Sequence, residues 1–388
     1  MNILLQLLLI LFLAKIFAEI IERAGFPGIL GEMAAGIFLG MLWINPDDDI
    51  LSFFSMLGAI FLLFIVGYKE INLQEVKASI KIALIPTLCS VIVPFSFGFL
   101  LGKAFNLEFI ECLFIGVAFS PTSIGVSVRT LIDLDYLSKK IGSTMLSSAI
   151  LDDIIGIFMF SVLISIATYH HIPTSMQLMI IGGKFVIFLI IMIILGWKVF
   201  PVLFTYIHKM QVKESIFAFV FMIAIFSAYL AEVFSLHAVI GAFIGGACLS
   251  SIPFAKIEDV QNKVSGISYG IFVPIFFAYI GLSIDLSAIQ GAGLFALLVI
   301  VLALSSKLIG GFIGTKIAGF NSYDSLIFGV GMMPRAGVEL VFISAGRGLG
   351  IIGDEIFSAI VLMIVVSVIV SPALLKLVIE YKERSVST

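Results

Sequence analysis

The sequence predicts an all-α protein that crosses a membrane many times. Of its 388 residues, 61% are hydrophobic and only 12% are charged, and the mean hydropathy is +1.22. A soluble domain carries about 25% charged residues, so this chain lacks the polar residues that would cover a soluble surface. Its apolar residues also fall into long stretches, most of them close to the roughly 20 residues that a helix needs to cross the hydrocarbon core.

Thirteen stretches are candidate membrane helices, and short loops connect them. The expected spans are residues 3–21, 28–44, 53–68, 79–102, 109–131, 140–169, 176–204, 214–234, 236–252, 266–284, 290–316, 323–349 and 354–380. The first lacks the basic flank of a secretory signal, so we expect it to be retained as a helix. No segment has the length and polarity of a soluble domain, so we expect residues 1–388 to form a single integral membrane unit.

The basic residues in the loops predict the orientation of the chain. With thirteen spans, sixteen Lys and Arg residues fall near the side that holds the C-terminus, and only Lys103 and Arg347 fall near the other side. Lys and Arg are enriched in cytoplasmic loops. We therefore expect a multi-pass protein of the cell (plasma) membrane with its N-terminus outside and its C-terminus in the cytoplasm, in contact with the lipid bilayer.

Composition argues against several other classes of protein. The net charge is −3 and no basic run predicts nucleic-acid binding. Cys89, Cys112 and Cys248 are isolated in apolar segments, with no spacing typical of a metal or redox site, so no cofactor is expected. An intramembrane aspartyl protease would need a Gly-x-Gly-Asp pattern; Asp354 follows Gly350-Ile351-Ile352-Gly353 and lies at the end of a span. We therefore do not expect an enzyme.

The two halves of the chain resemble each other. Three sets of residues recur at offsets of 210 to 214: Gly31–Leu39 with Gly241–Leu249, Pro121 with Pro334, and Gly67 with Gly281. Each match joins a span to the one seven spans later, so the two copies cross the membrane in opposite directions. Inverted repeats of this kind are typical of secondary transporters. The sequence thus predicts two inverted six-helix repeats, with residues 176–204 as a linker helix between them.

Two spans at matched positions of the repeat contain a proline. A proline removes a backbone donor and clashes with the preceding turn, so we expect helices broken at Pro121 and at Pro334, which Arg335 follows. One such break would be an ordinary kink, but a matched pair indicates a binding site near the membrane centre. The first break is surrounded by hydroxyl groups that can coordinate a cation: Ser120, Thr122 and Ser123.

Three charged residues lie deep in the predicted membrane. Asp152 and Asp153 are adjacent in span 140–169, and Lys307 lies in span 290–316. A charge at the bilayer centre costs at least ~2.5–3.5 kcal/mol, so a mere structural role is the weaker interpretation. Neighbouring helical residues point about 100° apart, so the two carboxylates have different surroundings. One can pair with Lys307 while the other binds either a proton or a sodium ion; the spacing alone does not say which.

Other charged residues carry no assigned role. Arg335 with Glu339, and Lys15 with Glu19, lie one helical turn apart and are expected to form local pairs. Glu32 and Glu232 lie near the ends of spans. We assign no function to Glu32, Glu232 or Glu339.

Together these residues resemble the CPA2-type monovalent cation/proton antiporters, and most closely the NapA subgroup of sodium/proton antiporters. The resemblance covers nearly the whole chain and is carried by Gly31-Glu32, Ser120-Pro121-Thr122-Ser123 with Arg129, Asp152-Asp153, Gly241-Ala242-Phe243, Phe276–Gly281, Lys307 and Gly331–Arg335. One departure is that Ala336-Gly337 follow Pro334-Arg335, where the family usually has Gly-Glu. The double aspartate is typical of the subgroup and unusual in the gated potassium-efflux relatives.

The resemblance implies an architecture. It implies the NhaA-like fold of thirteen transmembrane helices with two crossed broken helices. Residues 79–169 and 290–381 would form a core ion-translocation domain that moves like an elevator. Residues 1–70 and 213–286 would form the scaffold and the homodimer interface.

The resemblance also implies roles for residues. Asp153 would bind the ion and the proton, Asp152 would form the salt bridge to Lys307, and sodium would be held at Asp153, Asp152 and Thr122. The implied function is electrogenic Na⁺/H⁺ antiport by alternating access, serving pH homeostasis, with Li⁺ as a further candidate substrate. Potassium/proton antiport is the alternative, and sodium-coupled solute symport is a weaker one.

Overall fold

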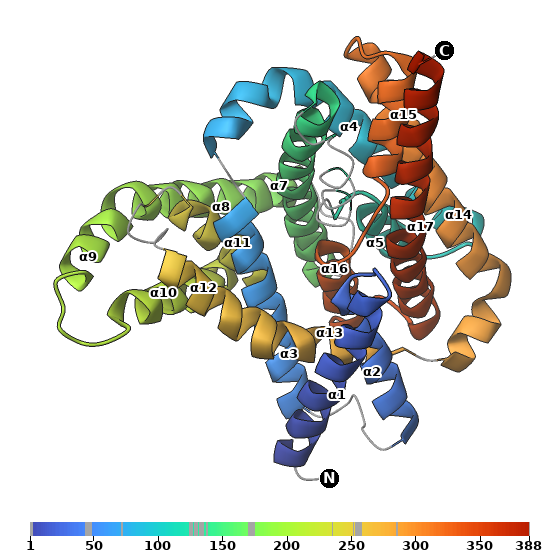
Figure 1. The fold of residues 1–388 in the computed structure, drawn as a ribbon. Helices are drawn as coiled ribbons and strands as arrows, with labels where there is room; N and C mark the ends of the chain where they lie inside the picture. Colours follow the sequence, from blue (N-terminus) through green and yellow to red (C-terminus); the bar gives the residue numbers. More distant parts are fainter. Residues whose placement is uncertain are drawn as a thin grey trace. The chain divides into compact units, whose positions relative to one another are not determined.

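A computed structural model describes residues 3–42, 49–70, 73–123, 127, 131, 136, 139–169, 175–234, 236–250, 252, 258–284 and 286–387. Within those ranges the chain consists of helices and short connections, with no strand (Figure 1). Nine of the described helices are long and apolar enough to cross a membrane, and three shorter ones are also apolar. The expectation of an all-α polytopic membrane protein is therefore confirmed.

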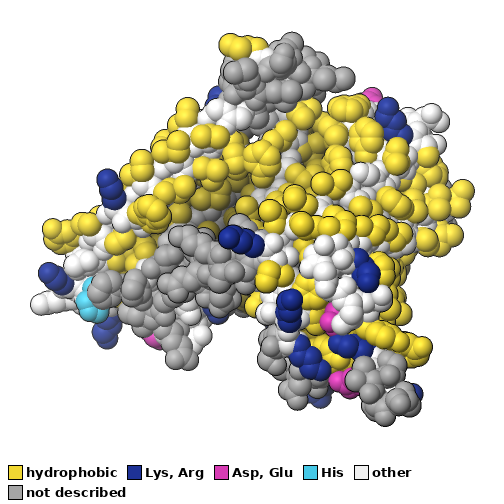
Figure 2. Space-filling view, turned by 90° about the horizontal axis from the view of Figure 1, so that it is seen from above, with side chains coloured by type: hydrophobic (Ala, Val, Ile, Leu, Met, Phe, Trp, Pro, Cys, Tyr) yellow, Lys and Arg dark blue, Asp and Glu magenta, His cyan; other side chains and the backbone are white. Residues whose placement is uncertain are grey.

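Large hydrophobic side chains are exposed on the helices, as lipid-facing surfaces require. Leu4 and Phe12 on α1 (Ile3–Arg23) and Trp197 on the π-helical segment η2 (Leu195–Val199) are 72%, 59% and 76% exposed. Figure 2 shows hydrophobic side chains over much of the drawn face, with Lys and Arg in small separate groups. A soluble protein rarely exposes so many contiguous apolar groups.

The chain divides into two compact units, and each is described by itself. Unit 1 comprises Met1–Ala24, Gly28–Leu73 and Ile164–Ser283; unit 2 comprises Gly25–Pro27, Gln74–Leu163 and Ile284–Thr388. Besides α1 and η2, unit 1 contains α2 (Gly28–Leu42), α3 (Asp49–Ile65), η1 (Val66–Glu70), α8 (Ser175–Ile194), α9 (Phe200–Ile207), α10 (Ser215–Val233), α11 (Ala238–Leu249), α12 (Glu258–Ile267), η3 (Ser268–Phe272) and α13 (Val273–Leu282).

Glycines bring the helices of unit 1 together. Helix α2 meets α13 where Gly36 lies against the carbonyl of Ala278 and Gly281 lies against the carbonyl of Met33. At both glycines an added Cβ would overlap the facing backbone. Small residues allow such close approach between membrane helices, where dispersion contacts hold the helices together.

A second contact in unit 1 repeats this pattern. Gly246 on α11 lies against the carbonyl of Phe64, and Gly67 on η1 lies against the carbonyl of Phe243. Gly36 and Gly246, like Gly67 and Gly281, are equivalent in the repeat found in the sequence. The repeated glycines therefore mark two of the places where described helices of this unit pack backbone to backbone.

Unit 2 carries most of α4 (Leu73–Ala104) and of α7 (Lys140–Tyr169), and also α5 (Phe109–Phe119), α14 (Leu286–Ile317), α15 (Ser322–Gly331), α16 (Val338–Gly348) and α17 (Asp354–Ser387). Helices α14, α15 and α17 pack side by side (Figure 1). Residues of α7, α15 and α17, among them Met145, Phe328 and Leu375, form a buried apolar cluster with Met332. This cluster supports the break that follows α15.

The two spans with prolines at matched positions of the repeat, Pro121 and Pro334, are both interrupted, as predicted. Helix α5 ends at Phe119, one residue before Ser120-Pro121, and the segment to Ser123 is not helical. Helix α15 ends at Gly331 and α16 begins at Val338, with Pro334 in the interval. The expected single span 323–349 is thus two half-helices in the structure.

Some helix boundaries differ from the predicted ones. The predicted span 266–284 begins eight residues early, at Glu258, because the polar residues there continue the helix and do not form a loop. Lys263 accounts for this extension: its Nζ lies 2.6 Å from Asp259 Oδ2 one turn away and 2.8 Å from Glu214 Oε1 before α10. Likewise α3 begins at Asp49, before the predicted residue 53.

Candidate ion-binding site

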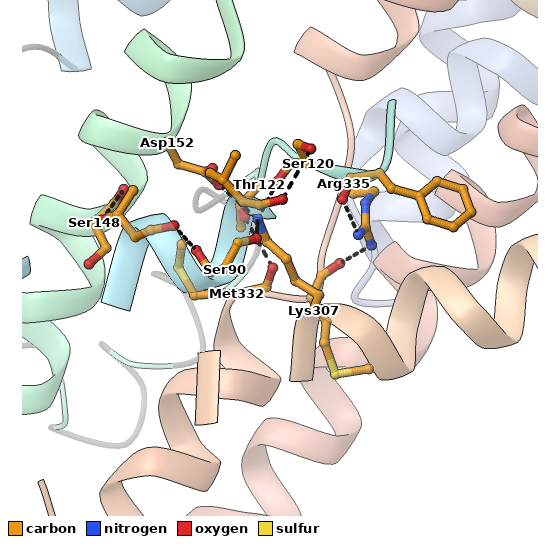
Figure 3. Close-up of polar contacts among 12 residues, drawn as sticks. Ser90, Ser120, Thr122, Ser148, Asp152, Lys307, Met332 and Arg335 are labelled. Carbon is orange, nitrogen blue, oxygen red and sulfur yellow. Dashed lines mark hydrogen bonds and ion pairs between the residues drawn. The ribbon is translucent and has the colours of Figure 1, made fainter. Parts of the chain in front are cut away.

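A fully buried ion pair lies in unit 2. Lys307 Nζ on α14 is 3.0 Å from Asp152 Oδ2 on α7, and neither side chain is exposed (Figure 3). Both residues were singled out from the sequence, where the partner of Lys307 could not be chosen from spacing. In the structure the partner is Asp152.

The ammonium of Lys307 has further partners. It donates to the carbonyl of Ser90 on α4 at 2.9 Å and to the carbonyl of Ser120, just after α5. With Asp152 these acceptors account for the three donors that an ammonium carries. Lys307 therefore joins α4, α7, α14 and the break after α5 at a single point.

Arg335 plays a parallel part in the same unit. Its guanidinium is buried and donates to the carbonyls of Phe119 at 2.6 Å, Ala303 at 3.1 Å and Met333 at 3.1 Å. Phe119 and Ser120 stand at the end of α5, where helix carbonyls lack intrahelical donors and carry partial negative charge. The two cations Lys307 and Arg335 thus cap the broken end of this half-helix.

Backbone carbonyls at the break after α15 accept hydrogen bonds from the segment that follows α5. Three donors of that segment reach carbonyls at the end of α15 or just beyond it: Ser127 Oγ to Gly331 at 2.6 Å, Thr122 Oγ1 to Met332 at 3.1 Å, and the Ser123 amide to Pro334 at 2.8 Å. The two interrupted segments are therefore in direct contact. These three carbonyls have donors, as burial in a membrane protein requires.

The hydroxyls expected to bind a cation have backbone partners in this structure. Ser120 Oγ donates to the carbonyl of Gly116 at 2.9 Å, and Thr122 donates to Met332. A hydroxyl that donates its proton keeps two oxygen lone pairs, so these groups can still coordinate a cation. Ser123 contributes its backbone amide to the described contacts.

Asp153 adjoins the ion pair on α7. It is 8% exposed, whereas Asp152 is fully buried, so the adjacent carboxylates do have different surroundings. One turn further on, Gly156 lies against the ring of Pro121, because a Cβ there would stand 3.0 Å from Pro121 Cγ. The turn that carries both aspartates is therefore held against the first break.

A polar contact between α4 and α7 was not predicted. Thr87 Oγ1 donates to the carbonyl of Ala83 at 2.7 Å and lies 3.5 Å from the carbonyl of Ser148, whose own hydroxyl lies 3.4 Å from the Ala83 carbonyl. Ser148 stands one turn before Asp152, a spacing that could have drawn attention to it. Nothing in the sequence around Thr87 indicates this contact.

Both expected local ion pairs are wrong. Glu339 Oε2 accepts the amide of Ala336 at 3.2 Å, and no ion pair joins it to Arg335, whose Nη1 and Nη2 donate to carbonyls. Lys15 Nζ lies 3.3 Å from Glu32 Oε1 on α2, not beside Glu19. Glu19 pairs instead with Arg23 (2.7 Å). Arg129, which contributes to the family resemblance, lies outside the described residues.

A buried carboxylate pair and lysine beside two interrupted, mutually contacting membrane helices define an ion-coupled secondary transporter. The family follows from sequence comparison. The profile of the transmembrane sodium/hydrogen exchanger family matches residues 8–380, and the chain belongs to that family.

Relatives of known name match almost end to end. The Na⁺/H⁺-K⁺ antiporter GerN of Bacillus cereus is 31% identical over 383 residues, which cover 98% of this chain and 97% of GerN. The Na⁺/H⁺ antiporter of Enterococcus hirae is 31% identical, over 95% and 96% of the two chains. Among solved structures, the sodium proton antiporter MjNhaP1 of Methanocaldococcus jannaschii superposes with a TM-score of 0.75 at 18% identity, over 96% of each chain. This last likeness concerns the fold.

Proposed function

We propose that the protein exchanges Na⁺ for H⁺ across the cell membrane by alternating access. The observation that carries this proposal is the adjacent pair Asp152 and Asp153, on a turn of α7 that packs against the first break, with Asp152 bound to Lys307. The names of the Bacillus and Enterococcus relatives support sodium and protons as the exchanged ions. Because one carboxylate cannot hold both ions, their competition is sufficient for exchange.

In this proposal the two aspartates have different tasks. Asp152 is bound to Lys307, so a cation there would have to compete with an ammonium at 3.0 Å. Asp153 is the group that takes either sodium or a proton, with Asp152 and the Thr122 hydroxyl as further oxygen ligands of sodium. Ser120 and Ser123 form part of the non-helical segment after α5. Pro121 at the first break, and Pro334 and Arg335 at the second, keep these segments non-helical. Oxygen ligands of this kind suit a hard cation.

We extend the proposal to the architecture. Thirteen helices in an NhaA-like inverted repeat would place the N-terminus outside and the C-terminus in the cytoplasm. Residues 79–169 and 290–381 would be the moving core, residues 1–70 and 213–286 the scaffold of a homodimer, and residues 176–204 the linker. The division into two compact units supports this assignment, because unit 2 holds the site and unit 1 the glycine-packed helices. Movement of the core relative to the scaffold would expose the site to each side in turn.

Potassium/proton exchange is the second candidate. It is favoured by one observation, the potassium in the name of the Bacillus relative. Lithium is a further candidate substrate, since it is a small hard cation like sodium. The exchange is proposed to be electrogenic, with more than one proton moved per sodium.

The proposal is tested with purified protein in proteoliposomes that carry an acidic interior and a pH-sensitive dye. Sodium or lithium added outside should collapse the gradient, and Asp153→Asn should not respond, because an amide neither releases a proton nor neutralises sodium. A response to potassium alone would favour the second candidate. No response to any of these cations between mildly acidic and alkaline pH would refute exchange.

A further inference from the structure

Besides Asp152 and Asp153, unit 2 contains a third buried acidic residue, which the exchange chemistry above does not use. Glu339 stands in the first turn of α16, is 1% exposed, and uses Oε2 to accept the Ala336 amide. Its other oxygen, Oε1, is buried without a hydrogen-bond partner among the described residues. A carboxylate in such a place is costly unless its charge is useful to its neighbours.

Glu339 lies close to the two cations that cap α5. It stands one turn after Arg335 and accepts the amide of the next residue, Ala336. Arg335 donates to the carbonyl of Phe119, and Lys307 donates to the adjacent carbonyl of Ser120. Glu339 makes no close ion pair with Arg335, whose Nη1 and Nη2 atoms are used by carbonyls. Glu339 is therefore a buried carboxyl group one turn from Arg335, with one oxygen that accepts an amide and one without a hydrogen-bond partner among the described residues.

The charges of this cluster cancel in pairs. Lys307 is matched by Asp152 at 3.0 Å. Arg335 is required to hold the carbonyls at the breaks, and without Glu339 its positive charge would stand unmatched next to a site that must bind cations. Uncompensated buried charge is expensive and would also repel an incoming cation.

Other charged groups near α16 lie at its opposite end. Helix α16 packs on α5 and α17. Glu111 and Cys112 lie in the first turns of α5, and Arg347 in the last turn of α16 pairs with Asp354 of α17 at 2.8 Å. Glu339 is thus the acidic residue at the end of α16 that adjoins Arg335.

We propose that Glu339 sets the cation affinity of the site by compensating the charge of Arg335. This inference rests on the proposed exchange of sodium and protons. Glu339 is a positioning residue, because it acts on the ion-binding carboxylates through its field and touches no transported ion. Sodium and the proton are both monovalent cations, so the field favours the binding of both by a similar factor.

The expected effect depends on pH in a way that a structural defect would not reproduce. For one unit charge acting across the protein interior, a change of about tenfold in a binding constant is the order of magnitude expected. In Glu339→Gln the KM for sodium should rise about tenfold at alkaline pH, where no proton competes. At acidic pH the KM reflects the ratio of the sodium and proton affinities, so the common factor cancels and the KM should stay near the wild-type value.

Three variants complete the test. Glu339→Ala removes the same charge without adding an amide donor near Arg335 and should reproduce the pH pattern, while Glu339→Asp keeps the charge and should stay near wild type. Glu111→Gln is the matched control, because Glu111 also accepts an amide at a helix start, that of Glu108 at 2.8 Å, but is only half-buried and lies at the far end of α5 from Arg335. Its KM should not change at either pH.

Each outcome is decisive. Equal KM values for the wild type and both charge-removing variants at alkaline pH would overturn the inference while leaving sodium/proton exchange intact. A KM raised equally at acidic and alkaline pH, or failure of both charge-removing variants to fold while Glu339→Asp folds, would make Glu339 a structural residue and would also overturn it. Absence of sodium exchange in the wild type would refute the proposed function itself.

Discussion

Replacing Asp152 with asparagine removes the charge that faces Lys307 but leaves the ammonium its carbonyl partners at Ser90 and Ser120. Removing one partner of a buried ion pair costs roughly 3–5 kcal/mol. Lys307→Ala should cost more, because it strands Asp152 and also leaves both carbonyls without this donor, at about 1–3 kcal/mol for each buried group. The contacts therefore predict that Lys307→Ala lowers the free energy of unfolding more than Asp152→Asn does.

The double variant Asp152→Asn with Lys307→Ala contains no stranded charge. It still lacks the donor to the Ser90 and Ser120 carbonyls, so it should remain less stable than the wild type. Its loss of unfolding free energy should nevertheless be smaller than the sum of the single losses by at least about 2 kcal/mol. The measurement is equilibrium unfolding of the purified protein in mixed micelles titrated with a denaturing detergent.

A matched control uses the neighbouring carboxylate. Asp153→Asn combined with Lys307→Ala should be additive to within about 0.5 kcal/mol if Lys307 pairs only with Asp152. Additive losses for Asp152 and Lys307, or stronger coupling of Lys307 to Asp153 than to Asp152, would show that the ion pair described here does not govern stability.

Two further substitutions test the packing. Arg335→Lys keeps the charge, but a single ammonium cannot replace the fork that reaches the carbonyls of Phe119 and Ala303, so we expect a loss of roughly 2–4 kcal/mol in stability and of exchange activity; wild-type melting and transport would contradict this. Gly281→Ala places a methyl group on a backbone carbonyl of α2 and should destabilise by about 1–3 kcal/mol, whereas Gly270→Ala, which meets open space, should stay within about 0.5 kcal/mol of wild type in the same thermal melts. Equal melting of the two glycine variants would contradict the close helix contact.

Features that depend on local chemistry could be predicted from the sequence. The breaks at Pro121 and Pro334 were predictable because the two prolines stand at matched positions of the repeat, whereas Pro86, Pro94 and Pro372 lie inside continuous helices. The burial of Asp152 and Lys307 in the middle of apolar spans was also predictable. The repeated glycines were also visible, although only the structure shows that Gly36 lies against the facing backbone.

Features that depend on distant partners could not be predicted. Lys15 has Glu19 one turn away, yet it reaches Glu32 on the next helix and the carbonyl of Tyr269 at 2.8 Å in the π-helical segment η3. Arg335 likewise donates to backbone carbonyls and forms no close ion pair with Glu339. The carbonyls of Phe119 and Met333 act as acceptors because they stand at helix breaks. The sequence does not show which side chains will lie near such a break. The choice of Asp152 over Asp153 as the partner of Lys307 has the same origin, because it depends on how α7 is rotated toward α14.

The central claim is that a carboxylate of the adjacent pair carries either sodium or a proton. The most direct measurement is uptake of radioactive sodium into proteoliposomes with an acidic interior, compared for the wild type, Asp153→Asn and the control Glu111→Gln, which lies outside the proposed site. The wild type and the control should accumulate sodium as long as the pH gradient lasts, and Asp153→Asn should accumulate none. Uptake by Asp153→Asn at the wild-type rate, or no gradient-driven uptake by the wild type, would contradict the account.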